Sequence, residues 1–233
     1  MPARFIIAFC FALNCLLAGH ALALDVTPFD EEAAQQFFAQ SQAKAGLWRL
    51  IHYYESQVDQ TYCGVASATI VLNSLEVGAP PSPAIYPYRK FDQINFFSEA
   101  VLAVKPPKYV HMSGLTLDEL GKMIASFGVR VDVHHAAAPL DLNGFRTLAS
   151  AALSDAKDRV IVNYHRKPLG QEGGGHHSPL AAYDAVSDRF LILDVARYRL
   201  PPVWAGAAEL WAAMNTEDTD AKANRGFIVI HAK

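Results

Sequence analysis

Cys63 is the residue of this sequence best suited to act as a nucleophile. It directly precedes the apolar stretch 65–75, which has the composition of a helix. A thiol at a helix N-terminus meets the positive end of the helix dipole, which favours the reactive thiolate. The other cysteines, Cys10 and Cys15, lie in an apolar run near the N-terminus. The alternative interpretation is an inert core cysteine, because unpaired cysteine is often buried.

A histidine and an aspartate farther along the chain would complete a hydrolase triad with this thiol. His176 follows a run of three glycines, and Asp194 ends a hydrophobic strand pattern. A turn near 187–188 would join two strands into a hairpin and bring His176 beside Asp194. The carboxylate would then fix the imidazole tautomer, while the other ring nitrogen faces Cys63.

Gln57 supplies a further group for the same chemistry, because it lies a short distance before the cysteine in the chain. Its side-chain amide and the backbone N–H of Cys63 would together hold the oxyanion of a tetrahedral intermediate. The sequence therefore predicts an enzyme that uses cysteine for nucleophilic catalysis.

The elements that must position these residues form two groups along the chain. Helical patterns cover 29–43, 63–76, 115–127, 142–156 and 208–214, and strand patterns cover 129–134, 159–164, 180–185, 189–195 and 226–231. The segment 47–54 is ambiguous between helix and strand, and the proline-rich segment 79–88 is expected as a loop. Because helices come first and strands cluster late, we predict an α+β fold with an N-terminal helical part packed on an antiparallel β-sheet.

Residues 1–23 have the pattern of a signal peptide. They carry Arg4 and no acid, and the run 5–18 is almost wholly apolar and short for a membrane span. We expect cleavage after Ala23 and export to the periplasm, which leaves residues 24–233 as a single catalytic domain. The alternative is a retained N-terminal membrane anchor. After cleavage no membrane partner is expected, because no second apolar run reaches membrane length.

The charge balance argues against a nucleic-acid partner. The 20 lysines and arginines against 23 aspartates and glutamates give a formal charge of −3. Such a chain has no basic field that would attract a polyanion.

Several longer motifs resemble the catalytic segment of phytochelatin synthases, over about residues 47–230. They are Tyr62-Cys63-Gly64-Val65-Ala66-Ser67, Gly175-His176-His177-Ser178-Pro179, Leu191-Ile192-Leu193-Asp194-Val195-Ala196-Arg197-Tyr198 and Pro201-Pro202-Val203-Trp204. The resemblance implies a papain-like cysteine peptidase fold and an enzyme that attacks the Cys–Gly bond of glutathione. The γ-glutamylcysteinyl group would form a thioester with the cysteine and pass to water or to a second glutathione, which gives phytochelatin.

The resemblance also implies roles for individual residues, matched by their positions in these motifs. The catalytic set is Cys63 as nucleophile, His176 as general base and acid, Asp194 as its orienting carboxylate and Gln57 as oxyanion donor. The substrate-binding set, for the γ-glutamyl amino and carboxylate groups, is Arg197, Asp218, Arg225 and Gly175.

Two features depart from the family pattern. His177 follows the expected base at a position where the family commonly has an aromatic residue, so His177 is the alternative base. The sequence also stops soon after the catalytic unit, without the cysteine-rich region of plant members. We therefore expect hydrolysis of the thioester to dominate over transfer.

The expected partners are glutathione and its metal thiolates. No organic cofactor is expected, and the remaining histidines, including His134 and His135, do not have the spacing of metal ligands. Cadmium or zinc would enter as a glutathione thiolate, that is, as substrate. A homodimer is left open. Two other functions also stay open: a cysteine peptidase of another small γ-glutamyl peptide, and a non-catalytic periplasmic thiol- or metal-binding protein.

Overall fold

The computed structural model describes residues 26–232. The predicted signal peptide, residues 1–23, lies outside these residues. Across 26–232, no helix is both long enough and apolar enough to cross a bilayer.

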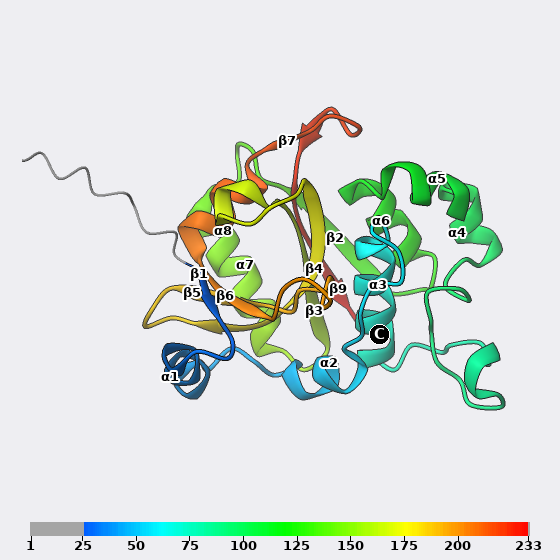
Figure 1. The fold of residues 1–233 in the computed structure, drawn as a ribbon, viewed down its shortest axis with the longest axis horizontal. Coiled ribbons are helices and arrows are strands. Elements are labelled where there is room, and N and C mark those ends of the chain that lie inside the picture. The colour runs from blue at the N-terminus through cyan, green and yellow to red at the C-terminus, as the bar shows by residue number, and fades with distance from the viewer. Residues whose placement is uncertain (1–25, 233) are drawn as a thin grey trace, which may run out of the picture.

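A seven-stranded antiparallel sheet is the frame of the fold (Figure 1). Its order is β1-β6-β5-β4-β3-β9-β2. The bounds are β1 Val26–Pro28, β2 Arg130–His135, β3 Asp158–His165, β4 Gly175–Asp184, β5 Arg189–Ile192, β6 Val203–Gly206 and β9 Gly226–His231. A separate short hairpin, β7 (Glu217–Asp218) and β8 (Ala223–Asn224), projects from the body of the molecule (Figure 1).

Helices cover both faces of this sheet. They are α1 Glu32–Gln40, α2 Leu47–Tyr53, α3 Cys63–Ser74, α4 Glu99–Val104, α5 Pro107–Ser113, α6 Leu117–Ala125, α7 Leu142–Ser154 and α8 Ala207–Met214, with 3-10 turns η1 Pro83–Ile85 and η2 Lys167–Leu169. Figure 1 shows α3 and α6 on one side of β3, β4 and β9, and α7 and α8 on the other.

Strand β3 shows how the alternation of side chains builds the two cores. Ile161 packs in the core that contains α3 and α6, whereas Val160 and Val162 pack in the core that contains α7 and α8. Successive residues of a strand point to opposite faces, so a sheet covered on both sides reads as a continuous apolar run.

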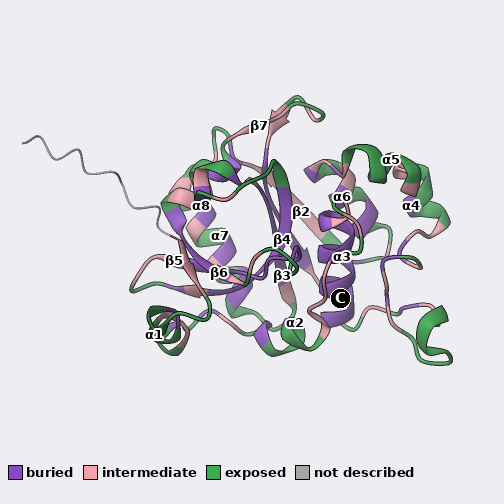
Figure 2. Cartoon of the chain, viewed as in Figure 1, coloured by how far each residue is buried: buried purple, intermediate pink, exposed green. Residues whose placement is uncertain are grey.

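Helix α3, which begins at Cys63, is buried along its whole length (Figure 2). Its sequence is apolar or small on every side and contains no proline, as expected for a helix inside a core rather than on a surface. Its packing against β4 therefore fixes where the Cys63 thiol lies relative to the sheet.

The opposite end of α3 is held by Arg159 of β3. The guanidinium donates to the Ser74 hydroxyl at 2.9 Å and to the Ser74 carbonyl at 3.0 Å, and it is 2% exposed. A cation at a helix C-terminus satisfies free carbonyl groups and complements the dipole. Burial lowers the pKa of Arg159 to about 10, which leaves it charged at neutral pH.

The predicted α+β class with an antiparallel sheet is confirmed. The ambiguous segment 47–54 is a helix, α2. The helices α4 and α5 and the strand β6 were not predicted, because their short segments lack a clear period.

Two strand boundaries were predicted wrongly, next to His176 and next to Asp194. The strand expected at 180–185 begins at Gly175, so it includes His176 and His177. Pro179 hid this extension, since proline is uncommon inside a sheet. The strand expected at 189–195 ends at Ile192, and Asp194 follows it in a turn where its own Oδ1 accepts the Ala196 N–H at 2.8 Å.

Arg159→Met should lower the free energy of unfolding by about 2–4 kcal/mol, because buried carbonyl groups at the end of α3 lose their donor. Urea unfolding followed by circular dichroism measures this change. Arg130→Met, on the exposed end of β2, is the matched control and should change stability by less than about 0.5 kcal/mol. Equal effects of the two substitutions would contradict a capping role for Arg159.

Candidate active site

Cys63 is the first residue of α3 and lines a cavity. The residue before it, Tyr62, provides no side-chain cap, so the first backbone N–H groups of the helix keep their capacity to bind an anion. The cavity has a volume of about 260 Å³. We call it the Cys63 cavity; its lining includes Cys63, Asn163, Gly175, His177, Asp218 and Arg225. A larger hollow of about 730 Å³ near Lys157 and Ala232 contains no candidate nucleophile.

A second cavity adjoins the first. It has a volume of about 540 Å³, and we call it the His176 cavity; its lining includes Gln57, Gln60, Arg166, Gly175, His176 and Arg199. Gln60 and Gly175 line both cavities, so the two are neighbouring parts of one cleft.

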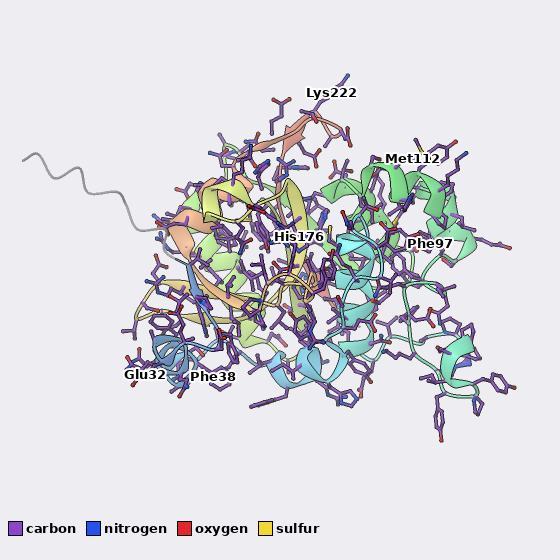
Figure 3. The ribbon with its side chains drawn as sticks, in the orientation of Figure 1. Glu32, Phe38, Phe97, Met112, His176 and Lys222 are labelled. Carbon is purple, nitrogen blue, oxygen red and sulfur yellow. The ribbon has the colours of Figure 1, made fainter. Side chains whose placement is uncertain are left out.

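His176 and Asp194 are brought together as the sequence predicted. The Nε2 of His176 lies 2.9 Å from Oδ1 of Asp194, and both side chains are buried. Figure 3 shows His176 in the interior of the molecule. A carboxylate can only accept here, so Nε2 carries a proton and Nδ1 is left as the reactive nitrogen.

Asp194 is fully buried and is held by more than the histidine. Arg166 donates from two nitrogens to the two carboxylate oxygens, at 2.8 and 3.0 Å. Burial raises the pKa of Asp194, but the hydrogen bonds and charges of His176 and Arg166 outweigh it and hold that pKa far below its usual range. The carboxylate is therefore charged at any pH at which the protein would work.

The same electrostatics act on the thiol. Burial raises the pKa of Cys63, but the charge of His176 and the hydrogen bonds of both histidines outweigh it, and the pKa lies well below its ordinary value. Burial lowers the pKa of His176, but the Cys63 and Asp194 charges beside it raise it above normal. This arrangement favours a thiolate–imidazolium pair at neutral pH.

His177 also reaches the thiol. Its Nδ1 lies 3.8 Å from the Cys63 Sγ, and its Nε2 lies 2.6 Å from the Asn163 side-chain amide. The structure thus brings both histidines to Cys63, whereas the sequence placed His176 there and left His177 as the alternative.

Gln57 is buried in the His176 cavity. Its Nε2 donates to the Asp59 carbonyl at 2.8 Å, and its Oε1 has no hydrogen-bond partner among the described residues. One of the two N–H donors of this amide is therefore occupied by the protein.

Three of the predicted substrate-binding residues meet at the Cys63 cavity, and one does not. Gly175, Asp218 and Arg225 all line it. Arg197 is exposed outside both cavities, with its guanidinium 4.5 Å from the centre of the Tyr54 ring and a hydrogen bond to the Tyr54 carbonyl. The geometry gives Arg197 no contact with the reacting centre.

Arg225 lines the Cys63 cavity with part of its guanidinium unpaired. It is 8% exposed, and one guanidinium nitrogen donates to the Glu217 carbonyl and to the Thr216 hydroxyl. Its buried Nε has no partner among the described residues. Gly175 makes room for it, because a Cβ at Gly175 would lie 3.0 Å from that Nε.

The sequence patterns did not indicate that Arg166 and Asn163 lie at the site. The available signal was a polar residue in an otherwise apolar strand: Asn163 interrupts the run from Val160 to Tyr164, and Arg166 follows the strand end. A buried polar group needs a partner, so such positions point to a polar site. Their partners could not be identified without the pairing of β3 with β4.

No group of three or more histidine, cysteine, aspartate or glutamate side chains is arranged to hold a metal ion within residues 26–232. The histidines of β2 and β9 have other contacts. His134 stacks on Phe227, and His231 lies between Asp132 and Asp158 at 3.1 and 2.7 Å.

A family model described as phytochelatin synthase matches residues 18–227. Glutathione gamma-glutamylcysteinyltransferase 3 of Lotus japonicus is 34% identical over 185 residues, which are 79% of this chain and 37% of the relative. Glutathione gamma-glutamylcysteinyltransferase 1 of Triticum aestivum is 36% identical over 186 residues, with 79% and 36% covered.

A more distant relative extends the same pattern. The glutathione gamma-glutamylcysteinyltransferase of Schizosaccharomyces pombe is 25% identical over 175 residues, which are 75% of this chain and 41% of the relative. The chain spans less than half the length of each of these curated relatives. The chain belongs to the phytochelatin synthase family.

Proposed function

We propose that this protein is a glutathione γ-glutamylcysteinyltransferase that works through a thioester on Cys63. The observation that carries the proposal is the position of the Cys63 thiol beside the buried His176–Asp194 pair, in a cavity that Arg225 and Asp218 also line. The names of the relatives support glutathione as the substrate.

The γ-glutamyl end of glutathione matches the charges of the Cys63 cavity. Its α-carboxylate would pair with Arg225, whose Nε is unpartnered, and its α-ammonium group would pair with Asp218. This pairing holds the cysteinyl carbonyl of the substrate above the Cys63 thiol.

In the acylation step the Cys63 thiolate attacks the carbonyl carbon of the Cys–Gly bond. The carbonyl oxygen becomes an oxyanion, which the Cys63 backbone N–H would bind. The Gln57 amide would join it through its second N–H, since the first donates to the Asp59 carbonyl. His176 then gives its Nδ1 proton to the glycine nitrogen, the C–N bond breaks and glycine leaves.

In the second step neutral His176 takes a proton from the attacking group. With water the products are γ-glutamylcysteine and the free thiolate; with the amine of a second glutathione the product is phytochelatin. We propose that water is the dominant acceptor. Metals would act as glutathione thiolates, as substrate, and the reaction needs no organic cofactor.

Incubation of the protein with glutathione should release glycine and γ-glutamylcysteine, with little or no longer peptide. Mass spectrometry of the reaction, with and without cadmium, measures both products. Cadmium-dependent oligomers would contradict dominant hydrolysis and make the protein a working synthase. If glutathione stays intact in both reactions, either another γ-glutamyl peptide is the substrate or the protein only binds thiols or metals.

Cys63→Ala should abolish glycine release and leave the fold intact, and His176→Ala should lower kcat by about 10³-fold or more. The physical reason is that the first change removes the nucleophile and the second removes the proton donor for glycine. His52→Ala, on the exposed face of α2, is the matched control. Full activity of either site variant would overturn the assigned roles.

Arg225→Met should raise KM for glutathione by about 10- to 100-fold, because a charge-assisted pair with the substrate carboxylate is lost. Gly175→Ala should act in the same direction through its contact with the Arg225 guanidinium. Initial-rate kinetics test both variants, and the rate of Cys63 alkylation should be unchanged in each. A KM equal to that of the unaltered protein in Arg225→Met would remove this residue from the substrate site.

A further inference from the structure

The Cys63 thiol has two imidazoles beside it, and the mechanism above uses only one. His176 and His177 are consecutive residues of β4, so their side chains leave the strand in opposite directions. His176 lines one cavity of the cleft and His177 lines the other, together with the thiol. The sulfur is therefore approached from two sides by two buried rings.

Contacts from two neighbouring elements hold the His177 ring against the thiol. Its backbone carbonyl accepts a hydrogen bond from the Ser67 hydroxyl at 3.2 Å, one turn of α3 beyond Cys63. Gly64 of α3 also lies beside the ring, since a Cβ there would be in ordinary van der Waals contact with Nδ1, at 3.6 Å. From β3, Asn163 lies directly opposite His177 and contacts its other nitrogen.

The partners of the two rings differ in charge. Nε2 of His176 contacts a carboxylate, which favours the imidazolium form. Nε2 of His177 contacts the Nδ2 of Asn163 at 2.6 Å, a partner that carries no charge. The amide nitrogen of Asn163 faces Nε2 and its Oδ1 has no partner among the described residues. In this orientation the amide donates to Nε2, so the ring proton lies on Nδ1, facing the sulfur at 3.8 Å.

We propose that His177 is a positioning residue for the nucleophile: a neutral imidazole, held by Asn163, that donates its Nδ1–H to the Cys63 thiolate. The proposal rests on Cys63 being the nucleophile. The hydrogen bond keeps the sulfur ionised and fixes its direction without any proton moving. It weakens in the thioester, whose sulfur is a poor acceptor, and forms again as the thiolate leaves.

The other charged groups around the thiol are the same whichever residue occupies position 177. His176 of β4 faces the thiol, with Asp194 and Arg166 behind it. Arg225, Asp218 and Asp220 line the Cys63 cavity, and α3 contributes no other titratable side chain. A difference in the pH dependence of Cys63 alkylation between variants at position 177 therefore comes from the side chain at that position.

The test is the pH dependence of Cys63 alkylation by iodoacetamide, followed by intact mass, in His177→Phe and His177→Asn. Phenylalanine keeps a ring and removes both nitrogens, whereas asparagine places a neutral N–H close to the position of Nδ1. In His177→Phe the acidic midpoint should rise by about one pH unit, with the rate on the acidic side falling about tenfold and the alkaline rate unchanged. His177→Asn should keep a midpoint close to that of the unaltered protein.

The sign follows from the charge state that is stabilised. A donor to the thiolate lowers the pKa of the thiol, so its loss moves the acidic midpoint upward. The alkaline limb, set by His176, should stay in place. His134→Phe, in β2 of the same sheet and outside the cleft, is the matched control and should shift neither limb.

Each outcome decides the question. An unshifted acidic midpoint in His177→Phe would mean that His177 contributes only packing. If both His177 variants lose glycine release and His176→Ala keeps it, His177 is the general base. If His177→Phe does not fold by circular dichroism, His177→Ala must show the shift that His177→Asn lacks. Alkylation needs no glutathione, so a shifted midpoint without glycine release would overturn the proposed function and leave this inference standing.

Discussion

The buried carboxylate of Asp194 is the constraint on which the rest of the cleft depends. A charge without solvent is costly unless partners surround it, and here Arg166, His176 and the Ala196 N–H all donate to it. These partners come from the end of β3, the start of β4 and the turn after β5. The hydrogen bonds to this one charge therefore hold three chain segments together, and they keep a proton on Nε2 of His176.

The pKa of the Cys63 thiol depends indirectly on this carboxylate, through His176. The Cys63 thiolate and the Asp194 carboxylate together raise the pKa of His176, and the charge of His176 in turn lowers the pKa of the buried thiol. Helix α3 contributes the second part, since its complete burial leaves Cys63 no freedom to move away from the sheet. Arg159 closes the far end of the same helix, so both ends of α3 are tied to β3 or β4.

Sequence patterns indicated Cys63, His176 and Asp194 as candidates, although the strand bounds next to His176 and Asp194 were predicted wrongly. They did not identify Arg166 and Asn163, since the role of a polar residue in a strand depends on which residue of the neighbouring strand faces it. The β3–β4 register pairs Asn163 with His177 and Tyr164 with His176. A shift of one residue would exchange the two histidines between faces. Register is set by long-range packing, which no local pattern contains.

The register also explains why a histidine is tolerated at 177. An aromatic residue at this position would fill the space between α3 and β3 by packing alone. A buried imidazole is stable there only if both nitrogens find partners, because an unsatisfied polar group costs about 1–3 kcal/mol. Asn163 supplies one partner from the facing strand, and Cys63 supplies the other from the helix end. The thiolate is thus part of what stabilises the ring, as the ring is part of what stabilises the thiolate.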